Sequence, residues 1–208
     1  MRKRIFALFC CGCLLAGLLT GCKEKAYEES VYEKYTPAGT VSIHFGPALN
    51  LLYDDTGMIL RISGENNTGR RLATCCTDLL FKPLSEGVPA LMQYAIDNHL
   101  LEDARTMVIR VGEEDPLVTE TMLTDLAKLC QASLDKQSIA IKAFPVEEES
   151  LVEGKYLPPA LVSQLAAIYL DCEPADVTCS PLTEGMYTVT YGEQSCTVDG
   201  FTGGVTVK

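Results

Sequence analysis

Hydrophobic and polar residues alternate along the first part of the chain that follows its N-terminal segment. In VSIHFGPALNLLYDD, residues 41–55, apolar residues occupy every second position on either side of Gly46 and Pro47. A period of two is typical of strands with one buried face, and proline is poorly tolerated within a central strand. The pattern predicts two strands joined by a Gly-Pro turn. A third strand is predicted over residues 58–63, with alternate residues from Met58 facing inward.

Two longer segments repeat apolar residues every three or four positions, which predicts amphipathic helices. The first helix is expected to begin at Ser85 and to carry its apolar stripe as far as His99. The second follows the Asp-Pro pair at residues 115–116, a combination of N-cap residue and first-turn proline. Strands are predicted over residues 106–112 and 138–144.

The order β-β-β-α-β-α-β predicts an α+β domain over residues 40–146, in which helices pack on one sheet. The acidic run PVEEES, residues 145–150, is interpreted as a solvated joint. A small α-β-β-β unit is predicted over residues 153–208, with two prolines opening its helix. So short a unit is marginally stable alone, and we expect it to pack on the first domain. Its strands are predicted over residues 177–182, 186–191 and 195–199, with a short extension at 205–207.

The first 21 residues have the layout of a bacterial lipoprotein signal. Three basic residues precede an apolar run over residues 5–19, and the sequence LTGC at residues 19–22 resembles a lipobox. In such signals the cysteine receives a diacylglycerol and becomes the new N-terminus, so Cys22 is predicted to carry lipid. Residues 22–39 would then tether the domain to the extracytoplasmic face of the cell membrane.

The apolar run is short for a permanent anchor, because a spanning helix needs about 20 apolar residues. The alternative is an uncleaved anchor with an incidental cysteine. Since only four residues precede the run, we expect no cytoplasmic domain.

The charge of the chain bears on its partners. It has 17 Lys and Arg against 28 Asp and Glu, a formal net charge of −11, and loss of the signal would remove three further positive charges. So acidic a protein is repelled by nucleic acid. We therefore expect no nucleic-acid partner, and we expect contact with the membrane through the lipid and with a cell-wall component or another envelope protein.

The two histidines are weak candidates for chemistry. His44 falls on the polar face of a predicted strand, where surface or turn packing is expected, and His99 falls on the apolar stripe of a helix, where a structural role is expected. Two histidines are too few for a three-histidine zinc site, and positions 44 and 99 are too far apart for the H-E-x-x-H motif. No nucleophile elbow, phosphate loop or dinucleotide fingerprint is present. We expect no catalytic residue, no metal and no cofactor.

Six cysteines follow Cys22, and none forms a C-x-x-C motif. The adjacent pair Cys75-Cys76 leaves open a thiol-dependent enzyme, although a vicinal pair in a loop is more simply incidental. Cys179 and Cys196 fall on strands predicted to be neighbours. A disulfide between them is an alternative to free thiols if their Cα atoms lie about 4.4–6.8 Å apart.

The order and spacing of these elements over residues 40–144 resemble the extracytoplasmic middle domain of RsgI-type anti-sigma-I factors. That family carries a strand, an Asp-x-Asn-Pro-Ser-x-Glu-Leu segment, a second strand, a Gly turn and a third strand that ends in an Asn-rich loop. The stretch TVSIHFGPALNLLYDDTGMILRISGENNTGRRL follows the same plan, and two helix–strand pairs come after it. Residues 158–208, with EPADVTCSPL and MYTVTYGEQSCTVDGFTGGV, resemble half of a PepSY-type repeat.

The resemblance implies a self-cleavage site that has lost its side chains. His44 stands where the family has Asp, Gly46 where it has Asn, Ala48 where it has Ser and Asn50 where it has Glu, so that only Pro47 matches. One route for Asn-Pro scission has the Asn carboxamide attack its own backbone carbonyl, which Gly46 cannot do. We therefore predict that this bond stays intact.

The resemblance also implies a role in signalling, although the sigma-binding segment of the family is not expected in this chain. The interpretation is a non-enzymatic extracytoplasmic lipoprotein that senses or binds an envelope component. The alternative is an inhibitor or regulator of an extracellular peptidase, because PepSY-type modules resemble protease propeptides.

Overall fold

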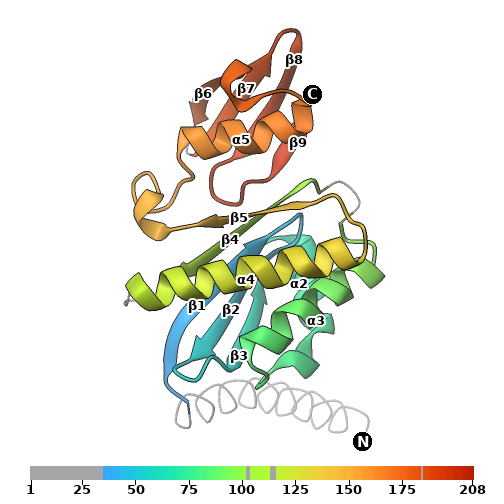
Figure 1. The fold of residues 1–208 in the computed structure, drawn as a ribbon, viewed down its shortest axis with the longest axis vertical. Coiled ribbons are helices and arrows are strands. Elements are labelled where there is room, and N and C mark those ends of the chain that lie inside the picture. The colour runs from blue at the N-terminus through green and yellow to red at the C-terminus, as the bar shows by residue number, and fades with distance from the viewer. Residues whose placement is uncertain (1–34, 102–103, 113–115, 184) are drawn as a thin grey trace, which may run out of the picture. The chain divides into compact units, whose positions relative to one another are not determined.

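The computed structural model describes residues 35–101, 104–112, 116–183 and 185–208, and it confirms an α+β fold (Figure 1). The predicted signal and Cys22, the predicted site of lipid attachment, lie outside these ranges, as does most of the predicted tether. Within the described residues, no helix has the length and apolar character needed to cross a membrane.

The first sheet has five strands: β1 (Pro37–His44), β2 (Ala48–Asp54), β3 (Ile59–Gly64), β4 (Thr106–Gly112) and β5 (Lys142–Val146). Their order in the sheet is β3-β2-β1-β4-β5. Strand β1 pairs antiparallel with β4, while β4 and β5 are parallel and are connected through α4 (Pro116–Lys136). Because β1 already begins at Pro37, the end of the predicted tether belongs to the sheet.

One face of this sheet is covered by three helices, α2 (Asn67–Cys75), α3 (Leu84–Asp97) and α4. Alternate residues of the central strands, such as Ile43 and Ile109, are fully buried against the helices. The predicted stripe of α4 is confirmed, since Leu126, Cys130 and Leu134 all belong to this core.

The C-terminal part consists of α5 (Pro159–Leu170) and four strands, β6 (Thr178–Thr183), β7 (Met186–Tyr191), β8 (Gln194–Asp199) and β9 (Val205–Val207). The strands follow one another as an antiparallel meander. This arrangement confirms the helix and the strands that the hydrophobic pattern predicts there.

A second hydrophobic core joins α5 and its sheet to the opposite face of the first sheet. Val108 of β4 and Phe144 and Val146 of β5 pack in one cluster with Leu165 of α5 and Val189 of β7. Val108 alternates along β4 with the residues of the first core, and alternate residues point to opposite faces of a sheet. The first sheet is therefore covered on both faces around β4 and β5.

Four sequence predictions are wrong in detail. Strand β5 begins at Lys142, four residues after the predicted start at residue 138. Helix α2 replaces a predicted turn, so the first domain has one more helix than expected. A β-bulge in β3 pairs Ile59 with Tyr53. Ile59 is fully buried and takes the inward-facing position that was predicted for Met58. The predicted solvated joint is shortened, because β5 continues through Pro145 and its last residue, Val146, is buried.

Candidate ligand-binding cleft

The turn between β1 and β2 is held by the side chain of Asn66. Gly46 adopts a left-handed backbone conformation with φ of +102°, which favours glycine. The Asn66 Nδ2 donates a hydrogen bond to the Gly46 carbonyl at 2.7 Å, and the Ala48 N–H donates to Asn66 Oδ1 at 3.2 Å. One carboxamide therefore bridges the peptide groups on either side of Pro47.

The same Asn66 is the N-cap of α2, because its Oδ1 also accepts from the Gly69 N–H at 2.7 Å. Gly69 is buried, and a Cβ atom at this position would overlap the Ala48 carbonyl oxygen. The first turn of α2 thus rests directly on the start of β2. Since a helix supplies no acceptor for its first N–H groups, those of Asn67 and Thr68 have no intrahelical partner.

A chain of polar side chains runs across the face of the first sheet that the three helices leave open. Ser42 Oγ donates to Asn50 Oδ1 at 2.7 Å, and Asn50 Nδ2 donates to Glu65 Oε1 at 2.6 Å. The other Glu65 oxygen lies 3.3 Å from His44 Nε2. The structure thus links His44 and Asn50, two positions that the resemblance assigned to a degenerate cleavage motif, through Glu65, which the sequence interpretation did not single out.

This environment stabilises the Glu65 carboxylate. The adjacent His44 ring lowers the pKa of Glu65 from 4.5 to about 2, with further help from the Asn50 hydrogen bond and the charge of Arg110, and partial burial opposes the shift. The His44–Glu65 contact is close enough for an ion pair, but it lacks the alignment of a hydrogen bond.

His44 is buried at the end of β1, so a surface position is wrong and packing beside the turn, the other half of the prediction, remains. Its side chain is 5% exposed, and neither ring nitrogen has a hydrogen-bond partner among the described residues.

The loop between β8 and β9 contacts the same face of the first sheet. Arg110 Nη1 donates to the Phe201 carbonyl at 3.4 Å, and Gly203 packs against Val108.

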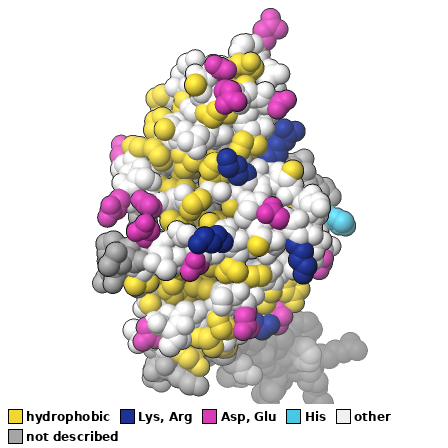
Figure 2. Space-filling model, viewed as in Figure 1, with side chains coloured by type: hydrophobic (Ala, Val, Ile, Leu, Met, Phe, Trp, Pro, Cys, Tyr) yellow, Lys and Arg dark blue, Asp and Glu magenta, His cyan; other side chains and the backbone are white. Residues whose placement is uncertain are grey.

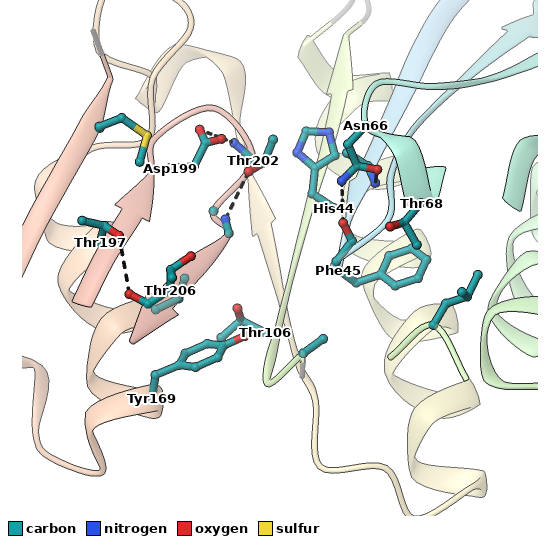
Figure 3. Close-up of a pocket in the computed structure, with 18 of the residues that line it drawn as sticks. His44, Phe45, Asn66, Thr68, Thr106, Tyr169, Thr197, Asp199, Thr202 and Thr206 are labelled. Atoms are coloured by element: carbon teal, nitrogen blue, oxygen red, sulfur yellow. Dashed lines mark hydrogen bonds between the residues drawn. The ribbon is translucent and has the colours of Figure 1, made fainter. Parts of the chain in front are cut away.

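A cleft of about 630 Å³ opens beside this turn (Figure 3). One wall consists of the turn and the first turn of α2, including His44, Asn66 and Thr68. The opposite wall comes from the second sheet and the β8–β9 loop, including Thr206 and Asp199. The cleft therefore collects polar side chains from segments more than one hundred residues apart in the sequence.

Both histidines of the chain line this cleft. His99 does not lie on the apolar stripe of α3 as predicted, because α3 ends at Asp97 and His99 adopts a left-handed conformation with φ of 53° and is exposed. Arg71 also lines the cleft and is exposed. The acidic group there, Asp199, accepts hydrogen bonds from the N–H groups of its own loop.

The remaining candidate residues are thiols. Cys179 and Cys196 do not face each other across neighbouring strands, because Val189 of β7 pairs with both and lies between them. Two strand spacings amount to about 9.6 Å, which is longer than the Cα–Cα separation that a disulfide allows. Both thiols are free. Burial raises the pKa of Cys76 to about 12, so little reactive thiolate forms there, whereas Cys75 is exposed.

No group of three His, Cys, Asp or Glu side chains in the described ranges is arranged to hold a metal ion. No protein-family model matches the chain, and no curated protein matches its sequence.

Proposed function

We propose that this protein is a non-enzymatic extracytoplasmic lipoprotein that binds an envelope component in the cleft beside the Gly46-Pro47 turn. The observation that carries the proposal is the cleft itself, about 630 Å³ in volume and lined by polar side chains of both sheets. Ligand sites in proteins are concave, have volumes of about 300–1,000 Å³ and present a few convergent polar groups.

The resemblance to RsgI-type middle domains supports a sensing role for the same region. The order of strands β1 to β3, followed by helices and strands β4 and β5, is compatible with that family, and Pro47 lies in the turn at the cleft. As a sensor of this kind, the protein would report on the envelope through a partner protein.

The distribution of charged side chains on the surface is compatible with a role in the cell envelope. Lys and Arg side chains are scattered singly over the face in Figure 2, between Asp and Glu, and they do not gather there into a basic patch.

The lipid anchor is tested by metabolic labelling with a fatty-acid analogue. Wild-type protein should incorporate the label and sediment with membranes, and Cys22→Ser should do neither.

The ligand proposal is tested by binding of soluble cell-wall fragments to the full-length protein in detergent. Two exposed threonines of the second sheet give a matched pair of variants, because Thr206 lines the cleft and Thr190 does not. A tryptophan at position 206 should fill the cleft and abolish saturable binding, while Thr190→Trp should bind like the wild type.

Absence of binding to wild-type protein, or equal binding by both variants, would contradict a ligand site in the cleft. Inhibition of an extracellular peptidase that is insensitive to Thr206→Trp would instead favour the peptidase-regulator alternative.

A further inference from the structure

We propose that the cleft recognises an oxyanion, a carboxylate or phosphate group of a small ligand, at the first turn of α2 with Arg71, His44 and His99 around it. This inference rests on the proposed function and specifies the chemistry of its ligand.

The first turn of α2 provides directed N–H donors. The helix has nine residues, and its dipole places partial positive charge at the end that faces the cleft. The Asn66 side chain occupies the Gly69 N–H but leaves the N–H groups of Asn67 and Thr68 without an intrahelical acceptor. Such an arrangement is a common binding site for anions.

The second, independent observation is His44. Its ring is 95% buried within a wall of the cleft, yet Nδ1 has no partner in the described part of the chain and Nε2 makes only the poorly aligned contact with Glu65. A buried polar group without a hydrogen bond costs about 1–3 kcal/mol, and native proteins rarely leave one without a water or ligand. Figure 3 shows the ring beside Asn66, across from Thr202.

The charges around the cleft favour an anion over a cation. Arg71 forms no ion pair with any residue that the structure describes, and its side chain is exposed at the cleft. His99 adds a second imidazole ring to the lining of the cleft. Asp199 is the opposing charge, but its Oδ1 is engaged by two loop N–H groups, and the Glu65 carboxylate is directed to Asn50 and His44.

The experiment uses the two histidines as reporters. Full-length ¹⁵N-labelled protein in detergent contains only two imidazole rings, so a long-range ¹H–¹⁵N spectrum shows two ring systems, which His99→Gln assigns. Inorganic phosphate and acetate are titrated separately at constant pH and ionic strength. At least one of the anions should shift the ring signals of both histidines along a saturable curve. The anion with the lower Kd shows whether the site prefers a phosphate or a carboxylate group.

Two arginine variants separate a site from general electrostatics. Arg71→Gln should raise the apparent Kd about tenfold, the effect of losing one charged hydrogen bond. Arg61→Gln removes the same charge from an exposed position on β3 that does not line the cleft, and it should change the Kd less than twofold.

Failure of both anions to produce a saturable shift would overturn the inference, and so would equal effects of Arg71→Gln and Arg61→Gln. If wall fragments still bind in a manner that Thr206→Trp abolishes, the cleft remains a ligand site and only its anion specificity is wrong. If wall fragments do not bind either, the proposed function is wrong as well.

Discussion

At the scale of single residues, Gly46 shows what the Gly-Pro pair does in the turn. Its φ of +102° is strained for any residue with a Cβ, while the nearest atom to such a Cβ, the Leu100 carbonyl oxygen, would lie at an ordinary 3.5 Å. Gly46→Ala should therefore lower the free energy of unfolding by about 1–2 kcal/mol through backbone strain alone. Gly46→Asn should cost less, since Asn tolerates positive φ better. Urea denaturation measures both, and an Ala variant as stable as the wild type would contradict the argument.

The same residue governs the prediction that the chain is not cleaved between Gly46 and Pro47. Gly46 has no carboxamide, and the carboxamide beside this bond, that of Asn66, is engaged with the Gly46 carbonyl and the Ala48 N–H. The intact mass of the purified protein should show a single chain that contains both Gly46 and Pro47. A pair of fragments that divide between these two residues would refute the prediction.

Glu65 makes stability depend on pH in a defined window. Its pKa falls from 4.5 to about 2 in the folded protein, so the folded state binds this proton less readily than the unfolded state. The resulting stabilisation is complete above about pH 4.5 and is lost as pH decreases towards 2. Glu65→Gln should flatten the pH dependence of the unfolding free energy in this window.

The matched control for this measurement is Glu193→Gln, in an exposed turn between β7 and β8. It should leave the pH profile close to that of the wild type. Identical profiles for Glu65→Gln and the wild type would show that the contact with His44 does not persist in solution.

At the scale of elements, Asn66 couples helix α2 to the β1–β2 turn. Asn66→Ala removes the N-cap and both hydrogen bonds to the turn, and should lower the free energy of unfolding by about 1–2 kcal/mol. Asn66→Asp keeps the acceptor for Gly69 and Ala48 but loses the donor to Gly46, so it should cost less. Thermal unfolding of the two variants provides the test, and equal losses would mean that capping is not the main contribution.

The elements that the sequence predicted well are those whose periodicity is set by burial. Strand β7 and strand β4 have the predicted bounds, and α4 has the predicted stripe. Helix α2 was missed because Leu72 is its only large buried residue, which leaves no stripe to detect. Its one local signal was Asn66, a favoured N-cap residue that also suits a turn.

The candidate site was less predictable than the elements, because long-range contacts create it. The alternation in β1 places His44 on the polar face. The loop around Phe201, 91 positions beyond Arg110, reaches the same face of the sheet through its hydrogen bond with Arg110. His99 reaches the cleft because α3 ends two residues before it. A local hydrophobic pattern contains no information on either event.

At the scale of the whole described chain, the second core packs the two sheets together, and we expect it to couple their unfolding. Val108, Phe144 and Val146 belong to the first sheet and bury their side chains with α5 and the second sheet. The small unit would be marginal alone, so its stability should depend on the first sheet. We therefore expect residues 38–208 to unfold in one cooperative transition.

Leu165 tests this expectation, since it is fully buried in α5 within the second core. Leu165→Ala should lower the free energy of unfolding by about 2–5 kcal/mol. Hydrogen exchange of amides in β2 and in β7 should report the same loss, because both strands would open in the same transition. The matched control is Val207→Ala on β9, where the side chain is 52% exposed, with an expected change below about 0.5 kcal/mol. Loss of protection in β7 alone would show instead that the C-terminal sheet opens independently, and the cleft between the two sheets would then open with it.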